Sequence, residues 1–186
     1  MDILGIDPSL SSTGIYYTGT KEYWLICSKP TKKLLRSKIN GVHVVPYEYS
    51  PQTNLSGPER ELMKAMNVYR ITNEIRKIIE KTHPDHVVLE AVAFNAGGTI
   101  DSLAGLNYAI RSILIEHKIP FTVLSPTTVK KYFVGNGGAK KDLMIRSWSL
   151  VESRSTDILS INKGDDLADA FAMAHCPREM LIDSDT

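Results

Sequence analysis

Two short apolar runs, each followed directly by an acid, limit what this chain can fold into. Residues 3–6 (ILGI) run into Asp7, and residues 87–89 (VVL) run into Glu90. The second run is apolar on both faces, which is typical of a central strand covered on each side by another layer. Adjacent parallel strands would set Asp7 and Glu90 side by side at one edge of a sheet.

The rest of the pattern alternates strands with helices, an order that indicates an α/β sheet with helices on its faces. Residues 42–49 alternate as an extra strand would, and Pro46 restricts that strand to an edge. The other expected strands are residues 2–7, 13–18, 22–27, 87–90 and 121–124. The expected helices are residues 58–82, 99–117, 126–134, 140–152 and 165–175, with a polar loop at 153–163.

Length and composition indicate one globular unit. The chain has 186 residues, close to the size of one ordinary domain, and its apolar fraction of 42% is enough for a core. No internal repeat, low-complexity tract or interdomain linker divides the sequence. We therefore expect a single domain over residues 1–186, with a basic insertion at about residues 28–57.

Cysteine usage and hydropathy indicate a soluble, intracellular protein. Cys27 and Cys176 are too few for a disulfide framework, which fits a reducing compartment. The first residues (MDILGID) form a strand pattern with two acids and not the pattern of a signal peptide. No apolar run approaches the roughly 20 residues that span a bilayer.

Asp166 and Asp169 complete a set of four acids with Asp7 and Glu90. Because they are three residues apart, they are neighbours on one helical face, and an apolar stripe would dock the same helix on the sheet. Carboxylates are the hard oxygen ligands that Mg²⁺ prefers. Two such ions about 4 Å apart can clamp the attacking and leaving oxygens of a phosphodiester displacement. The four acids together therefore predict a metal-dependent nuclease.

Each acid taken alone also has an ordinary explanation. Asp7 is compatible with a turn or a cap, and Asp165 and Asp166 are compatible with a favourable charge at a helix N-terminus. Glu90 is harder to explain in this way, because a carboxylate that ends a central strand is costly if it is buried without a partner. The opening motif GIDPSLSSTG also resembles the phosphate loop of sugar kinases and related ATPases of the actin-like fold. A two-domain kinase, however, needs a longer chain and a second phosphate loop.

Basic and aromatic residues add candidates for contacts with a nucleic acid, although the net charge of +1 neither indicates nor excludes such a partner. Two basic clusters could contact phosphates or form a solvated surface: Lys29, Lys32, Lys33, Arg36 and Lys38, and Lys130, Lys131, Lys140, Lys141 and Arg146. Lys140 and Lys141 follow a Gly-rich loop, so they either meet a scissile phosphate or form an exposed helix start. Phe94 is either a stacking wedge for an unpaired base or a core aromatic.

Four segments together resemble the RuvC-type Holliday-junction resolvases of the RNase H-like superfamily. They are GIDPSLSSTG at residues 5–14, VVLEAVAFNAGGTIDSLAGL at 87–106, SPTTVKKYFVGNGGAKKDL at 125–143 and DDLADAFAMAHC at 165–176. They span most of the chain in the family's order. The resemblance implies a mixed five-stranded sheet flanked by helices. It also implies a homodimer whose two active sites each nick one of two opposed strands of a four-way DNA junction.

The resemblance also implies roles for individual residues. Asp7, Glu90, Asp166 and Asp169 match the family's metal-binding acids, which would hold two Mg²⁺ ions per active site, with Mn²⁺ as a substitute. The Asp-x-x-Asp spacing selects Asp166, with Asp165 as a substitute ligand. Lys141 matches the basic residue that the family uses near the phosphate. The expected DNA-binding residues are Phe94, Lys130, Lys131, Lys140, Lys141, Lys32, Lys33 and Arg36.

The chain departs from the compact bacterial pattern in two places. The stretch between Gly14 and the long helix is longer, which resembles phage and viral relatives, and the aromatic residue after Glu90 is displaced to Phe94. The resemblance thus implies a structure-selective DNA endonuclease of the cytoplasm, in a bacterial cell or a phage-infected host. Its products would carry 5′-phosphate and 3′-hydroxyl ends, and it would have no membrane partner and no small-molecule substrate. The alternatives are broader cutting of forks and flaps, cutting of RNA–DNA hybrids, and a non-catalytic DNA-binding dimer.

Overall fold

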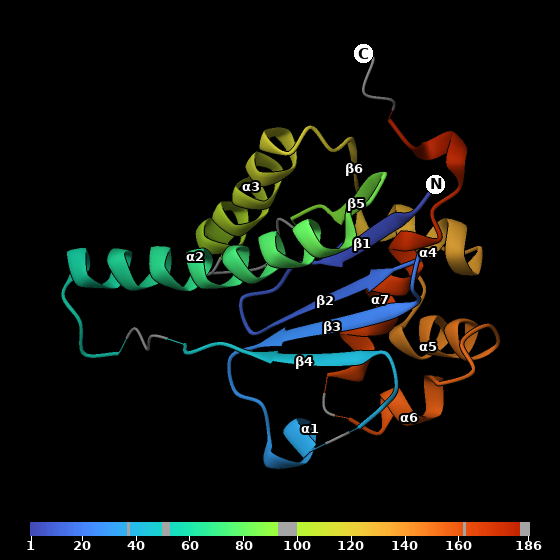
Figure 1. Ribbon diagram of the computed structural model, residues 1–186, viewed down its shortest axis with the longest axis horizontal. Coiled ribbons are helices and arrows are strands. Elements are labelled where there is room, and N and C mark those ends of the chain that lie inside the picture. The colour runs from blue at the N-terminus through green and yellow to red at the C-terminus, as the bar shows by residue number, and fades with distance from the viewer. Residues whose placement is uncertain (37, 50–52, 93–99, 162, 183–186) are drawn as a thin grey trace.

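The computed structural model describes residues 1–36, 38–49, 53–92, 100–161 and 163–182, and its centre is a six-stranded sheet in the order β4-β3-β2-β1-β5-β6 (Figure 1). The strands are β1 (Ile3–Asp7), β2 (Ser12–Tyr17), β3 (Glu22–Cys27), β4 (Val42–Pro46), β5 (His86–Glu90) and β6 (Phe121–Leu124). β2 is antiparallel to both of its neighbours, whereas the other neighbouring strands are parallel. The mixed sheet that we expected is confirmed.

β4 makes the sheet one strand wider than the five strands that the resemblance implies. It belongs to the segment that we predicted to be an insertion (residues 28–57), pairs in parallel with β3 and lies at the edge of the sheet, where Pro46 is its last residue. The insertion also contains α1 (Lys32–Arg36), whose Leu34 is only 2% exposed and joins the core. The insertion is therefore packed against the rest of the chain through both a strand and a helix.

Helices cover both faces of the sheet. One face carries α2 (Gly57–Thr82) and α3 (Ile100–Glu116), and the other carries α4 (Pro126–Val134), α5 (Lys141–Ser149), α6 (Ser155–Leu159) and α7 (Gly164–Ala174) (Figure 1). The alternation of side chains along β1 explains the two cores: Leu4 and Ile6 pack with α2 and α3, whereas Ile3 packs with α7. A short 3-10 helix, Arg178–Met180, follows. None of the helices in the described ranges is long and apolar enough to cross a lipid bilayer.

Most helix ends follow signals that are readable in the sequence. At the start of α2, Glu59 accepts a hydrogen bond from the backbone N–H of Ser56 at 2.9 Å, and Pro58 occupies the first turn. His83, in the left-handed conformation with a φ of 46°, ends α2 as expected. Ser125 caps α4 through its side-chain oxygen, which accepts a backbone hydrogen bond at 3.1 Å.

The prediction was wrong beyond the end of α5 (Lys141–Ser149), because contacts distant in sequence decide the structure there. The helix expected over residues 140–152 is shorter, and the stretch 153–163 contains α6. Glu152 is only 7% exposed and accepts hydrogen bonds from the Tyr23 hydroxyl at 2.8 Å and from Arg154 Nε at 3.1 Å. This buried ion pair stabilises a turn of the chain that no local pattern predicts.

Two glycines allow α7 to lie directly on the sheet. A Cβ atom at Gly5 in β1 would lie 2.2 Å from the backbone oxygen of Ala170, and a Cβ atom at Gly14 in β2 would lie 2.2 Å from the backbone oxygen of Asp166. Both distances are far shorter than a van der Waals contact. The helix approaches β1 and β2 this closely because neither position carries a side chain.

We expect Gly14→Ala to lower the free energy of unfolding by about 1–3 kcal/mol, because the added methyl group must push α7 away from the sheet. Gly105 in α3 is the matched control, since a Cβ atom there would meet open space. Gly105→Ala should raise the free energy of unfolding by about 0.5–1 kcal/mol through helix propensity. Urea denaturation followed by circular dichroism measures both changes. If Gly14→Ala were as stable as the wild type, the close packing of α7 would be refuted.

Candidate active site

Two acids leave the sheet side by side where β1 and β5 end. In the parallel pairing of these strands Ile6 lies opposite Leu89, and the next residues along the two strands are Asp7 and Glu90. Both acids are partly exposed at this edge. The arrangement expected from the two apolar runs is therefore confirmed as geometry: the carboxyl ends of neighbouring parallel strands present two carboxylates together.

Helix α7 brings the other two acids to the same edge. Its N-terminal part lies over β2, because the backbone of Asp166 lies directly against Gly14. Leu167 is fully buried and anchors this part of the helix in the core. Asp169 is close enough to Asp7 to raise the pKa of its carboxyl group. The structure thus brings together the four acids that the sequence singled out.

The electrostatics of Asp7 and Glu90 show how tightly the acids are crowded. Burial and the negative charges of Glu90 and Asp169 raise the pKa of Asp7 well above its usual value, as does a hydrogen bond that the Asp7 carboxyl donates to Glu90. Burial also raises the pKa of Glu90, although the hydrogen bond from Asp7 and the positive charge of Lys130 oppose this effect. The pair therefore retains a proton more readily than two isolated acids would.

The acids of α7 lie in the same field. Burial, with a smaller effect from the charge of Glu90, raises the pKa of Asp169 to about 7. Burial also raises the pKa of Asp166, and the nearby Ser12 hydroxyl opposes this rise. Within the described part of the chain, Ser12 Oγ and Asp166 Oδ2 are nevertheless buried without a well-formed hydrogen bond. An orphaned carboxylate oxygen next to three further acids is suited to a cation.

A lysine lies beside the four acids, but it forms an ion pair with a fifth acid. Lys141, the first residue of α5, forms an ion pair with Asp165. Although burial opposes it, this lysine lowers the pKa of Asp165 below its usual value. Asp165 and Asp166 are adjacent in the sequence, yet their environments differ: one is neutralised by Lys141, and the other remains among the acids. The geometry therefore favours Asp166 over Asp165 as a member of the acid cluster.

The chemistry of the donors fits a hard divalent cation. Asp7, Glu90, Asp166 and Asp169 offer only carboxylate oxygens, the ligands that Mg²⁺ and Mn²⁺ accept. Among the described residues no group of three or more His, Cys, Asp or Glu side chains is arranged so that it could hold a metal ion. The four carboxylates interact electrostatically, with one orphaned oxygen, but they do not converge on a single point.

The predicted DNA-binding residues divide into two groups. Lys130 in α4 lies near enough to Glu90 to oppose the rise in its pKa. Lys131 in α4 and Lys140, the residue before α5, are exposed. Lys32, Lys33 and Arg36 are exposed on α1, beyond the edge strand β4 (Figure 1). None of these three contributes to the pKa shifts of the acid cluster. Phe94 lies outside the described residues.

Sequence reasoning missed a residue that holds the end of β5 in place. Asn107 in α3 is 1% exposed, and its side-chain nitrogen donates a hydrogen bond to the backbone oxygen of Glu90 at 2.7 Å. Its oxygen accepts a hydrogen bond from Arg111 Nε at 2.8 Å. The signal was present, because an asparagine on the apolar face of a predicted helix needs a partner once it is buried.

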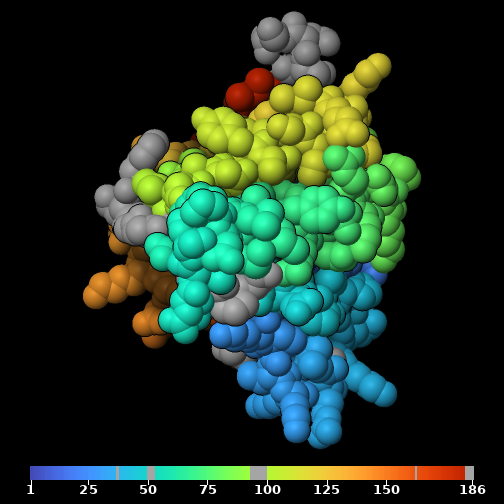
Figure 2. Space-filling model, turned by 90° about the vertical axis from the view of Figure 1, so that its left-hand side faces the viewer, coloured from blue at the N-terminus to red at the C-terminus, as the bar shows by residue number. Residues whose placement is uncertain are grey.

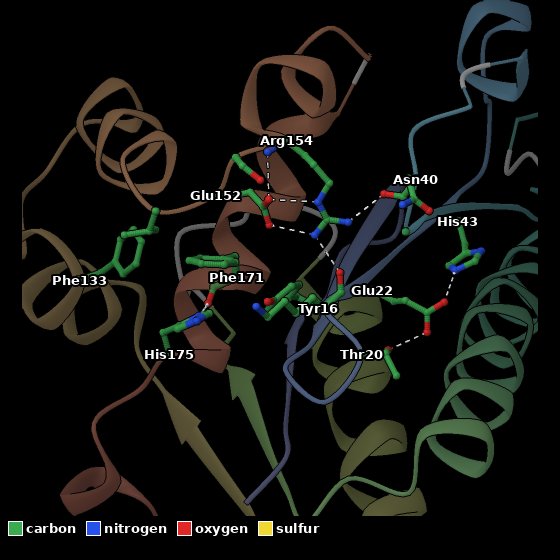
Figure 3. Close-up of a pocket in the computed structure, with 14 residues that line it drawn as sticks. Tyr16, Thr20, Glu22, Asn40, His43, Phe133, Glu152, Arg154, Phe171 and His175 are labelled. Carbon is green, nitrogen blue, oxygen red and sulfur yellow. Dashed lines mark hydrogen bonds and ion pairs between the residues drawn. The ribbon is translucent and has the colours of Figure 1, made fainter.

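A hollow of about 950 Å³ lies at the other end of the sheet (Figure 3). Its wall includes Tyr16 near the end of β2 and His175, which follows the C-terminal end of α7, whereas the acids lie at the N-terminal end of α7. Two ion pairs line it, Arg154 with Glu152 at 3.0 Å and Glu22 with a histidine at 2.8 Å. The hollow is separate from the acid cluster and offers no comparable set of ligands.

Comparisons with known proteins agree with this geometry. The family model of crossover junction endodeoxyribonuclease RuvC matches residues 58–177. The chain is 25% identical over 177 residues to the protein of that name from Syntrophomonas wolfei, which covers 95% of this chain and 87% of the relative. It is 31% identical over 142 residues to the protein of that name from Orientia tsutsugamushi strain Ikeda, covering 76% of this chain and 75% of the relative.

A solved structure shows the same fold. The structure described as T. thermophilus RuvC in complex with Holliday junction substrate superimposes with a TM-score of 0.54 at 21% sequence identity. The match covers 94% of this chain and 90% of the other. The expectation of an RNase H-like architecture is thereby confirmed. The affinity with phage and viral members stays a prediction, because the relatives named here are bacterial.

Crowded acids should make the metal-free protein less stable as the pH rises. The pKa of Asp169 is raised to about 7 in the folded protein, while an unfolded aspartate titrates near 3.8. The contribution of Asp169 to the free energy of unfolding is therefore fully present below about pH 4 and is lost as the pH rises through 7. We expect Asp169→Asn to remove this loss and to raise the free energy of unfolding at pH 8 by about 1–2 kcal/mol.

Urea denaturation in EDTA at pH 5 and pH 8 measures this effect. Asp157→Asn, which changes an exposed acid in α6, is the control and should leave the pH dependence unchanged. Added Mg²⁺ should stabilise the wild type at pH 8 and should stabilise Asp169→Asn less. A wild type and an Asp169→Asn protein with the same pH dependence would refute the electrostatic description of the site.

Proposed function

The chain belongs to the family of crossover junction endodeoxyribonuclease RuvC, and we propose that it resolves four-way DNA junctions by paired symmetric nicks in opposed strands. Nucleases of this family are metal-dependent. The observation that supports the proposal most directly is the meeting of Asp7, Glu90 and Asp169 at one sheet edge, beside the ammonium group of Lys141. Carboxylates that can bind cations are a known arrangement for metal-assisted hydrolysis of a phosphodiester bond.

Four acids have the proposed role of metal ligands. Asp7, Glu90, Asp166 and Asp169 would hold two Mg²⁺ ions, for which Mn²⁺ substitutes. When bound, such ions supply the Lewis-acid charge for in-line hydrolysis of the phosphodiester bond. The raised pKa values of the acids support this assignment, because a cation would relieve the repulsion that now holds protons in the cluster. Asn107 would position Glu90 through its backbone.

Lysines have the proposed role of binding the substrate phosphates. Lys141 would meet the scissile phosphate and exchange its ion pair with Asp165 for one with the phosphoryl oxygens, where negative charge develops in the transition state. Lys130, Lys131 and Lys140 would contact neighbouring phosphates. The products would carry 5′-phosphate and 3′-hydroxyl ends.

Two nicks in opposed strands require two active sites, so we propose that a homodimer acts on each junction. The outer faces of α2 and α3 expose large apolar side chains, among them Tyr69 at 68% and Tyr108 at 64%. Exposed apolar side chains of this size are typical of a surface that another protein covers. Each protomer would be one nuclease domain of the cytoplasm, with Lys32, Lys33 and Arg36 of the insertion available to outer arms of the DNA.

We expect Asp7→Asn to lower the rate of junction cleavage by about 100-fold or more while leaving junction affinity within about twofold, because it removes a ligand and not the DNA surface. Cleavage is measured on an end-labelled synthetic four-way junction in Mg²⁺, beside a linear duplex, a replication fork and an RNA–DNA hybrid. Affinity is measured by fluorescence anisotropy of the same junction.

Each substrate separates one function from another. Symmetric nicks in opposed strands of the junction, absent with Asp7→Asn, would establish a resolvase. Equal cutting of forks would broaden the activity to branched DNA, and cutting of the hybrid alone would indicate a ribonuclease H. Binding without cutting would indicate a non-catalytic DNA-binding protein. If Asp7→Asn lowered junction affinity as much as it lowered cleavage, the proposal that Asp7 acts only as a metal ligand would be refuted.

Asp165 and Asp166 form a matched pair for a second test of the site. We expect Asp166→Asn to abolish cleavage in the same assay, because Asp166 lies within the acid cluster. Asp165→Asn should lower cleavage by about tenfold or less, because it removes the partner of Lys141 but no proposed ligand. The reverse order of effects would show that Asp165 takes the place of Asp166 as the ligand.

A further inference from the structure

A second hollow, of about 500 Å³, adjoins the acid cluster. Its lining includes Pro8 and Ser11 of the loop that directly follows Asp7, and Lys29 and Tyr49 of the insertion. The start of α3 contributes Leu103. Figure 2 shows this side of the molecule, with the insertion in blue below the N-terminal part of α2 in blue-green and the start of α3 in yellow-green. Its volume is within the range of roughly 300–1,000 Å³ that small ligands occupy.

We propose that this hollow takes up one nucleotide of the cut strand next to the scissile phosphate, so that the insertion forms part of the substrate-binding site. The inference rests on the proposed function. Because Pro8 follows Asp7 in the chain, a strand whose phosphate lies at the acid cluster passes the hollow with its neighbouring nucleotide. The continuity between hollow and acids therefore favours a nucleic-acid strand over an unrelated small molecule.

The lining suits a nucleotide. Pro8, Leu103 and the partly buried ring of Tyr49 present apolar surfaces for a base, and aromatic rings stack on bases of any identity. The hydroxyl groups of Ser9 and Ser11, which lie 3.3 Å apart, are polar groups of the kind that contact phosphates and sugars, whereas the Ser28 hydroxyl donates to the backbone oxygen of Ser11. The hollow thus combines an apolar face with polar groups, as the base and the backbone of one nucleotide require.

The charge at the hollow is positive where the strand would pass. Lys64 at the wall is already engaged, since it lies 2.9 Å from Glu61 and 2.6 Å from Asp101. Lys29 is exposed, and within the described ranges of the chain no ion pair engages it. Its ammonium group is therefore available to a phosphate.

Hydrogen bonds hold the insertion against the loop after Asp7. Ser28 donates from its backbone N–H to the backbone oxygen of Ser11 at 3.2 Å, and the buried Tyr47 hydroxyl donates to the backbone oxygen of Leu10. Ser11 and Leu10 belong to the wall of the hollow. The insertion is thus held against the loop after Asp7 at its start and again through Tyr47.

Tyr49→Leu, Tyr49→Phe and Lys29→Ala test the proposal in the full-length protein. Junction cleavage is measured in Mg²⁺ with intact junctions and with junctions that carry a single abasic nucleotide at each position near the cut. We expect one abasic position to raise the KM of the wild type by roughly fivefold or more. Tyr49→Leu should raise KM for the intact junction by a similar factor. With this variant, the abasic nucleotide at that position should cause no further rise in KM. Tyr49→Phe should behave as the wild type because it keeps the ring.

Lys29→Ala tests the charge independently and leaves the core intact. We expect it to raise KM by roughly three- to tenfold and to lower the slope of log KM against log salt concentration by about 1. Lys77→Ala on α2, which removes an exposed lysine far along the helix, is the matched control and should change neither value. Thermal unfolding of every variant separates a loss of folding from a loss of binding.

The outcomes separate this inference from the proposed function. A wild type that resolves junctions, together with Tyr49→Leu and Lys29→Ala proteins whose KM and abasic profiles are unchanged, would overturn the inference and leave the function intact. A wild type that cuts no DNA junction would overturn both. A ring-dependent abasic position beside the cut would establish the hollow as a nucleotide site.

Discussion

The contact on which the rest of the structure depends is the approach of α7 to β1 and β2, backbone against backbone. It exists because Gly5 and Gly14 leave no side chain between helix and sheet. The same contact fixes the distance from Asp166 and Asp169 to Asp7 and Glu90. The packing of α7 on the sheet therefore also sets the geometry of the acid cluster. If the helix were held further from the sheet, Asp7 and Glu90 would lack the two acids of α7.

That constraint crowds negative charge, and the neighbouring groups show how the fold tolerates it. Burial and mutual repulsion raise the pKa values of Asp7, Glu90 and Asp169, while Lys130 and Lys141 offset part of the charge from α4 and α5. Sites that must bind a cation commonly remain unfavourable for the protein alone, since stability and function make opposite demands. The acid cluster has this character.

Much of the fold and the site could be predicted, because local chemistry encodes it. Apolar runs marked the strands, Ser56 and Ser125 marked helix starts, and acids at strand ends marked the site. The remaining features depend on partners far apart in the sequence. The Glu152–Arg154 turn needs Tyr23, and the difference between Asp165 and Asp166 arises only once Lys141 is placed. No pattern within a short window predicts these contacts, although the Asp-x-x-Asp spacing that the resemblance implies had already selected Asp166.

The order in which the acids occur along the chain has a consequence for synthesis. Asp7 comes first along the chain, Glu90 follows it, and the acids of α7 come last. Proteins are made from the N-terminus, and contacts between distant segments form late. A nascent or prematurely ended chain that lacks α7 therefore has half of the acid cluster. A cleavage activity that needs all four acids would therefore arise only after α7 has been made and has packed on the sheet.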